Sequence, residues 1–146
     1  MTNVRVEIIG IEKTLADLGA VGAKSEKAVL DHIIALTLGT QAAAVRGIQG
    51  PPKTGRIYSK FRPKRAHQAS APGQYPATDT GRLVAAIGVE LPTNRKAPVA
   101  RVGTALRYGA YLETRNAARG GRPWLHRALI EAAAIIDEED LKRRMG

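Results

Sequence analysis

The chain has 146 residues, which is enough for one domain with its own hydrophobic core. It carries 23 Lys and Arg against 13 Asp and Glu, for a formal net charge of +10, and it has no cysteine. The lack of cysteine excludes disulfides, thiolate metal ligands and thiol nucleophiles. The positive charge favours nucleic acid, acidic protein or an anionic surface as a partner. We predict a single domain over residues 1–146.

The N-terminus lacks the order of charged, apolar and small residues that marks a signal peptide. We also identify no uninterrupted apolar run long enough to span a bilayer. The expectation is a protein made and used inside a cell, or released from it by lysis, without a membrane partner.

One strand and two helical segments are predicted in the first third of the chain. Apolar and polar residues alternate over residues 4–8, which is the period of a half-buried strand. A short amphipathic segment follows at residues 11–18, and the longest helix is predicted over residues 25–46. Its apolar residues cover more than one stripe, so we expect burial on two sides. The glycines and prolines of residues 47–52 are predicted to end it.

Residues 51–78 are predicted to form a long extended arm. They hold most of the prolines, and no acidic residue occurs between His32 and Thr78. A connection of this length inside a compact domain is usually functional or disordered, so we predict a projecting arm with a loose hairpin in it. Basic and aromatic residues together suit phosphates and stacked bases, or an acidic protein neighbour, and the sequence leaves both open. The arm residues predicted to contact a partner are Lys53, Arg56, Tyr58, Lys60, Phe61, Arg62, Lys64, Arg65 and Tyr75.

The arm is predicted to rejoin the domain at the motif Asp79-Thr80-Gly81-Arg82-Leu83. Asp79 or Thr80 is expected to cap a short helical turn over residues 81–85, because a side-chain oxygen there can accept from an unpaired amide. Apolar alternation over residues 87–91 and a second run over residues 98–104 predict a β-hairpin.

Two further helical segments are predicted in the last third of the chain. Residues 108–113 are expected to form one helical turn, followed by a basic, glycine-containing loop at residues 115–121. Pro123 is predicted at the first position of a C-terminal helix with apolar residues at helical spacing. The acids of residues 138–140 each face a base four residues on, which predicts an exposed, soluble helix end. Candidate interface or core-edge residues beside this helix are Tyr108, Tyr111, Arg122 and Trp124.

The sequence offers no constellation typical of an enzyme. The three histidines lie far apart without a metal-spaced partner, and no nucleophile elbow, carboxylate pair or phosphate loop is present. We therefore predict no catalytic, cofactor or metal site, and a protein that is not an enzyme.

Three stretches occur in an order that resembles a family of small phage morphogenesis proteins at the head-to-tail joint of long-tailed bacteriophages. They are "KTGRIY", "HQASAPGQYPATDTGRLVAAIGVEL" and "ARVGTALRYGAYLETRNAARGGRPWLHRALIEA", and the likeness covers about residues 1–140. Members act as tail-completion, tail-terminator or head-tail joining proteins. Where the family often carries Glu-Phe-Gly-Thr, this chain has Glu113-Thr114-Arg115-Asn116.

The resemblance implies a small α+β unit in which a small antiparallel or mixed β-sheet is packed by the long helix and the C-terminal helix. It further implies a ring, commonly of six copies, that ends the tail tube and faces the head, in the virion neck after assembly in the host cytoplasm. The partners would be the chain itself, the tail-tube protein and a head-side adaptor or stopper, and DNA would cross the lumen.

A ring would account for a helix that is apolar on two sides, and for an arm that reaches an adjacent subunit. We favour protein contacts for the arm, because a lumen that held DNA tightly would slow ejection. The alternative is a small basic nucleic-acid-binding module.

Overall fold

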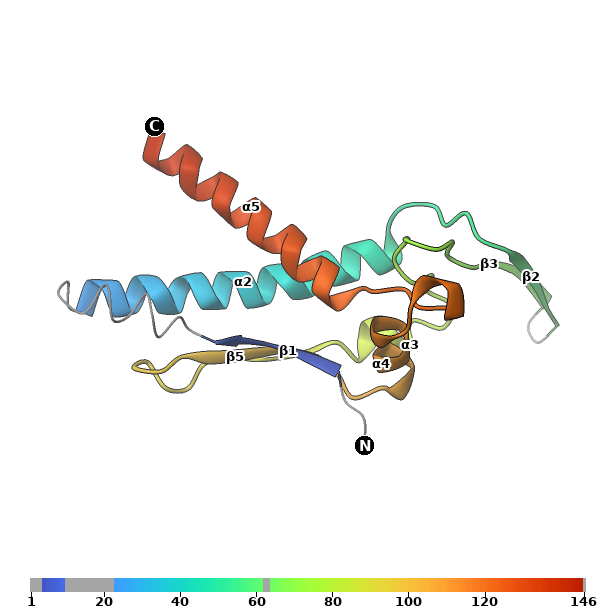
Figure 1. Ribbon diagram of the computed structural model, residues 1–146, viewed down its shortest axis with the longest axis horizontal. Helices are drawn as coiled ribbons and strands as arrows, with labels where there is room; N and C mark the ends of the chain where they lie inside the picture. The colour runs from blue at the N-terminus through green and yellow to red at the C-terminus, as the bar shows by residue number, and fades with distance from the viewer. Residues whose placement is uncertain (1–3, 10–22, 62–63, 146) are drawn as a thin grey trace.

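The computed structural model of the chain describes residues 4–9, 23–61 and 64–145. The amphipathic segment predicted at residues 11–18 and the arm residue Arg62 lie outside the described residues. The model is an α+β fold, as expected, with a small antiparallel sheet, two long helices and a separate β-hairpin (Figure 1).

The main sheet has three antiparallel strands in the order β1-β5-β4, so β5 lies in the middle. These strands are β1 (Val4–Ile9), β4 (Gly88–Glu90) and β5 (Val99–Thr104), and Val102 of β5 pairs with Val6 on one side and Val89 on the other. Alternate residues of β5 are buried, as expected for a strand with one face on the core. The predicted N-terminal strand and the second hairpin are both confirmed.

The two long helices pack against each other, and α2 also packs against β5 of the sheet (Figure 1). They are α2 (Ala23–Gln49) and α5 (Leu125–Met145). Between the helices and the sheet lies the core, whose largest fully buried side chains include Trp124, Leu125, Ile48 and Val102. Burial of such aliphatic and aromatic groups is the main stabilising term of the fold.

Helix α2 runs beyond the predicted end at residue 46. Gly47 is helical, and a Cβ placed there would lie 2.5 Å from ring carbons of Tyr75, so the glycine makes room for this ring. The helix ends where Pro51 and Pro52 follow Gly50, because prolines have no N–H for a helical bond. Lys53 Nζ then donates to the Gly47 carbonyl at 2.7 Å, which satisfies one of the last carbonyls.

Part of α2 is apolar enough to cross a membrane. Among the described residues, Glu26–Gln49 meets this criterion by length and composition, although charged residues such as Asp31 and Arg46 interrupt its apolar run. A buried core helix meets the same criterion, and α2 buries Val29, Ile33, Ala44 and Ile48 inside the protein.

Two expectations about helix starts are wrong. Helix α5 begins at Leu125, and its first helical bond runs from Ala128 N to Trp124 O, so Pro123 lies just before the helix and not at its first position. The short helix α3 (Arg82–Ala85) begins after Gly81, whose φ of 75° suits glycine, and no side chain caps it. The cap expected from Asp79 or Thr80 is therefore not formed.

Candidate partner-binding surface: a basic hairpin and its anchor

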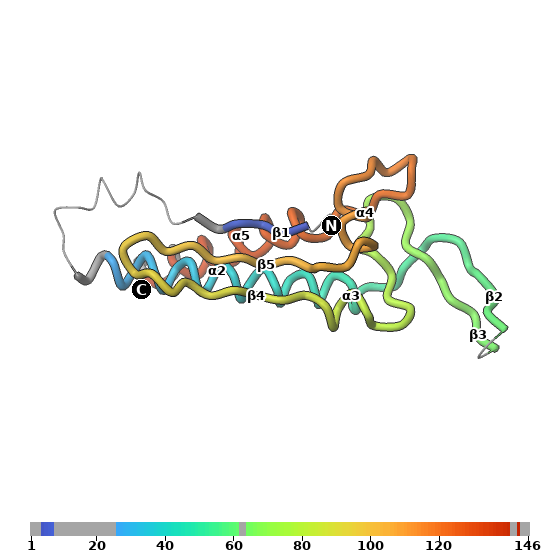
Figure 2. The backbone as a smooth tube through the Cα atoms, turned by 90° about the horizontal axis from the view of Figure 1, so that it is seen from below, coloured from blue at the N-terminus to red at the C-terminus, as the bar shows by residue number. Residues whose placement is uncertain are grey.

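The predicted arm contains an ordered β-hairpin. Strands β2 (Ile57–Phe61) and β3 (Lys64–Gln68) pair antiparallel, and they project beyond the rest of the molecule in two perpendicular views (Figures 1 and 2). At the base of the hairpin, Gly55 N donates to Ala69 O and Ala69 N donates to Arg56 O, both at 2.9 Å. None of the described residues of β2 or β3 belongs to the buried core.

The register of the two strands gives the hairpin two different faces. Side chains alternate along each strand, so Tyr58 and Lys60 of β2 share one face with their partners in β3. This anchored face consists of Tyr58, Lys60, Arg65 and His67. The opposite face is exposed throughout; we call it the outer face, and it consists of Ile57, Ser59, Phe61, Lys64, Ala66 and Gln68.

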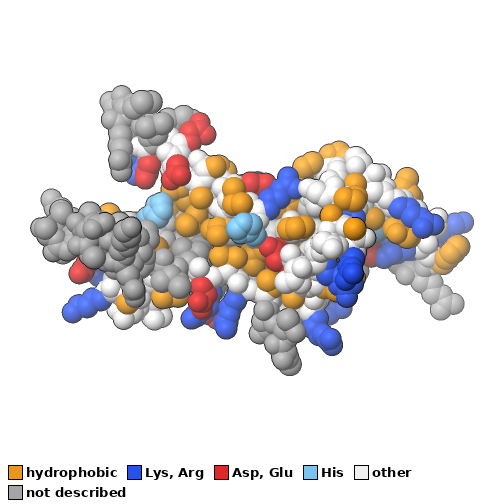
Figure 3. All heavy atoms as spheres, viewed as in Figure 1, with side chains coloured by type: hydrophobic (Ala, Val, Ile, Leu, Met, Phe, Trp, Pro, Cys, Tyr) orange, Lys and Arg blue, Asp and Glu red, His pale blue; other side chains and the backbone are white. Residues whose placement is uncertain are grey.

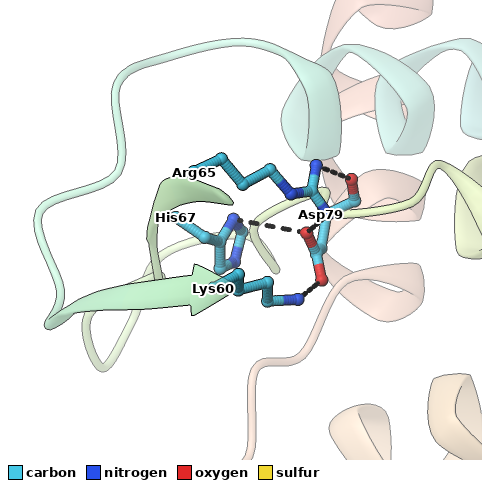
Figure 4. Close-up of polar contacts among 4 residues, drawn as sticks. All are labelled: Lys60, Arg65, His67 and Asp79. Carbon is cyan, nitrogen blue, oxygen red and sulfur yellow. Dashed lines mark hydrogen bonds and ion pairs between the residues drawn. The ribbon is translucent and has the colours of Figure 1, made fainter. Parts of the chain in front are cut away.

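Asp79 holds the anchored face to the body of the protein (Figure 4). Its carboxylate forms an ion pair with Lys60, accepts from Arg65 Nη2 at 2.5 Å, and lies 3.9 Å from His67 Nδ1. Arg65 Nη1 also reaches the Asp79 carbonyl at 3.4 Å. The sequence predicted that Asp79 caps the turn where the arm rejoins the domain, whereas its carboxylate binds Lys60 and Arg65 of the hairpin.

The contribution of these ion pairs to stability is small. Lys60 and Arg65 keep 38% and 40% of their side-chain surface exposed, and partly exposed pairs contribute at most about 1 kcal/mol each. The ion pairs instead hold the hairpin in one direction relative to the body, because Lys60 and Arg65 both bind the same carboxylate. A two-stranded hairpin alone is only marginally stable.

Two of the predicted arm residues contribute to the body. Tyr75 is only 6% exposed; its hydroxyl donates to Glu131 at 2.9 Å, and Arg127 lies 4.5 Å above its ring. Burial and the hydrogen bond to the Glu131 carboxylate raise the pKa of Tyr75 well above its usual value. Lys53 binds the end of α2. Tyr75 and Lys53 are therefore not part of the hairpin surface.

The set predicted beside the last helix divides into core and surface. Trp124 is fully buried and its indole N–H donates to Gly109 O at 3.0 Å, so it is a core residue. Arg122 donates to the Ser70 carbonyl at 3.1 Å and joins the loop to the base of the arm. Tyr108 and Tyr111 are exposed on α4 (Arg107–Thr114), where Arg115 stacks 3.8 Å from the Tyr111 ring.

Sequence reasoning missed the role of Glu113. Its carboxylate accepts from the backbone amides of Trp124, Leu125 and His126 at 2.7 to 3.0 Å, and so caps the start of α5 from another helix. A carboxylate at this end also matches the helix dipole. The sequence around Trp124 has no local pattern that would predict a cap from a residue eleven positions away. Between α4 and α5 the chain forms the 3-10 helix η1 (Ala117–Arg119), which the side chain of Asn116 caps.

One pocket of about 520 Å³ lies where the arm meets helices α3 and α4. Asp79, Arg82, Arg107 and Tyr108 contribute to its wall. Within the described part of the chain, no three His, Cys, Asp or Glu residues gather as metal ligands would. The hairpin with its Asp79 anchor is thus the surface that the sequence and the structure single out together.

Comparisons with known proteins add no further constraint. No family model, curated protein or solved structure matches the chain.

Proposed function

We propose that the chain is a structural subunit of the head-to-tail joint of a long-tailed phage, which assembles as a ring that completes the tail tube. The sequence resemblance motivates this function, and the projecting hairpin is the observation that carries it. The hairpin adds nothing to the core, so its fixed position does not serve the stability of the body. Contact with a neighbouring subunit accounts for this position.

The apolar side chains of the outer face support this assignment. Phe61 is 81% exposed and Ile57 is 62% exposed, on an element with no layer behind it. Burying such groups against another chain releases about 25 cal/mol per Å² of apolar surface, so their burial would contribute favourably to assembly.

Nucleic-acid binding is the second candidate, because Tyr58 and Phe61 are exposed and Arg56 lies 5.4 Å from the centre of the Tyr58 ring. The charge distribution makes it the weaker one. Lys60 and Arg65 are already engaged by Asp79, which leaves fewer hairpin cations for phosphate contacts.

The two functions differ in their response to salt. The experiment is to measure the mass of the purified chain at low and high salt, alone, with tail-tube protein and with duplex DNA. The head-to-tail joint function is supported if the chain forms a discrete ring, either alone or on the tail tube, and if this ring persists at high salt. A monomer that ignores the tube and binds DNA with a steep salt dependence refutes it in favour of the nucleic-acid module.

A further inference from the structure

Two hollows of the molecular surface meet at the first turn of α4. The pocket of about 520 Å³ between the arm, α3 and α4 has an apolar lining that includes Ile48, Leu83 and Leu106. A second hollow of about 540 Å³ lies along the exposed side of α4. Arg107 and Tyr108 line both hollows, so the two adjoin and share a wall. Ligand pockets usually have volumes of about 300 to 1,000 Å³, and both hollows fall in this range.

The exposed residues of α4 lie on one side of the helix. Counted from Arg107 at about 100° per residue, Tyr111 lies about 40° round the helix and Tyr108 about 100°. Thr114 lies about 20° to the other side. These four residues are exposed, whereas Gly109 on the opposite side of the helix is buried. Helix α4 therefore presents two tyrosines and an arginine together.

The arginines around these hollows can meet an acid from outside. Arg82 and Arg107 are exposed, and neither forms an ion pair within the described part of the chain. Arg115 is exposed as well and lies 3.8 Å from the centre of the Tyr111 ring. Asp79 lines the first pocket, but two cations of the hairpin already pair with it. Lys and Arg side chains gather at this end of the molecule (Figure 3).

An apolar floor with arginines and tyrosines at its rim suits a segment that has acids beside a large apolar side chain. The apolar side chain gains by burial, the acids gain by pairing with arginine, and Tyr and Arg are residue types that anchor protein interfaces. A copy of this chain is a poor source of such a segment, because each copy has a net charge of +10. Single-stranded nucleic acid also suits the surface less. Bases stack on open aromatic faces, and Arg115 already covers one face of Tyr111.

We propose that the pocket between α3 and α4 binds an acidic segment of a different protein, in which acids flank a large apolar side chain. That side chain lies against Leu83 and Leu106 on the floor of the pocket. The acids pair with Arg82 and Arg107 at its rim. This inference goes beyond the proposed ring, because it concerns a partner other than a second copy and depends neither on the hairpin nor on assembly.

The test uses a peptide of the stated chemistry. The isotope-labelled chain is titrated with the capped hexapeptide Asp-Glu-Leu-Phe-Glu-Asp while the amide chemical shifts are followed. We expect saturable shifts over residues 79–83 and 106–111 with a Kd below about 1 mM, a range that such a titration measures. Two matched peptides replace either the acids by Asn and Gln or the Leu and Phe by Ser. Each should bind about tenfold more weakly, because each lacks one of the two contributions.

Two variants of the chain locate the binding site. Arg82→Gln with Arg107→Gln should bind the acidic peptide about tenfold more weakly. The control, Arg95→Gln with Lys96→Gln, removes two exposed bases from the loop between β4 and β5 and should bind like the wild type. All four positions are exposed, so circular dichroism should show that both variants fold.

Several outcomes would overturn the proposal. Absent shifts, or equal affinities of the two variants, would mean that the pocket does not bind the peptide. Equal affinity of the Ser-containing peptide would show attraction by surface charge alone. If oligothymidylate shifts the same amides at equal or lower concentration, the partner is a nucleic acid. If these amides shift when the concentration of the chain alone is raised, a second copy occupies the pocket.

Discussion

At the scale of single residues, two glycines of α2 differ in what surrounds them. A Cβ at Gly47 would meet the Tyr75 ring at 2.5 Å, whereas one at Gly39 would lie 3.4 Å from Ala132 Cβ, an ordinary contact. We expect Gly47→Ala to lower the free energy of unfolding by about 1 to 3 kcal/mol, since overpacking outweighs the helix propensity gained. Gly39→Ala is the control, and its expected change is between zero and a gain of about 1 kcal/mol. Urea denaturation measures both, and equal effects would contradict the proposed role of Tyr75.

Tyr75 also predicts a dependence of stability on pH. Its pKa is higher in the folded chain than in the unfolded one, so its stabilising contribution is complete below pH 10 and is lost as pH rises above that value. Tyr75→Phe lacks the ionisable group. The difference in unfolding free energy between wild type and this variant should therefore shrink by up to about 1.4 kcal/mol per pH unit above 10. Urea denaturation at pH 8 and pH 11 checks this, and a constant difference would show that Tyr75 ionises as readily folded as unfolded.

At the scale of elements, the start of α5 depends on a side chain from α4. Glu113→Gln keeps the size of the side chain but removes the charge that three amides share. We expect a loss of about 1 to 2 kcal/mol in the free energy of unfolding, the usual magnitude for a lost cap. Glu139→Gln, an exposed acid near the other end of the same helix, should change it by less than about 0.5 kcal/mol. Equal denaturation midpoints for the two variants would exclude the capping role.

The ion pairs between the hairpin and the body meet at one residue, Asp79. Asp79→Asn removes the charge that binds Lys60 and Arg65, so we expect several-fold faster amide hydrogen exchange over residues 57–61 and 64–68. The melting temperature should change little, because partly exposed ion pairs contribute little to global stability. Asp31→Asn, which breaks the exposed pair with Lys27, is the control and should leave hairpin exchange unaltered. Unchanged exchange in Asp79→Asn would mean that the anchor does not hold the hairpin.

The sequence predicted the helices and strands better than it predicted which residues of different elements contact each other. Alternation over residues 4–8 and helical spacing in residues 125–136 reflect burial on one face, so these elements were found. The cap from Glu113, the burial of Tyr75 and the pairing of Asp79 with the hairpin all join residues at least eleven positions apart. Such contacts follow from tertiary packing, which periodicity and local propensity do not encode. The expected Asp79 cap failed for this reason, since two hairpin cations compete for its carboxylate.

At the scale of the whole molecule, the body and the hairpin are separable. The core consists of residues from α2, α4, α5, the main sheet and the segments around Tyr75 and Leu83, and no described residue of β2 or β3 enters it. Replacing residues 56–68 by a two-glycine linker is feasible because Gly55 and Ala69 are already hydrogen bonded. We expect the shortened chain to keep a melting temperature within a few degrees of the wild type but to lose assembly. Thermal unfolding and solution mass test this, and an unfolded shortened chain would show that the hairpin is structural.

The anchor at Asp79 has a consequence for the size of the assembly. A head-to-tail contact repeats the same rotation from one copy to the next, and only a suitable rotation closes the series. In the proposed ring, the direction in which the hairpin points would contribute to that rotation, and the Asp79 carboxylate holds the hairpin in this direction. The curvature of the proposed assembly, and hence the number of copies in a closed ring, would then depend on Asp79, which pairs with Lys60 and Arg65 of its own chain. Loosening Asp79 would broaden the distribution of sizes, towards open chains as well as rings.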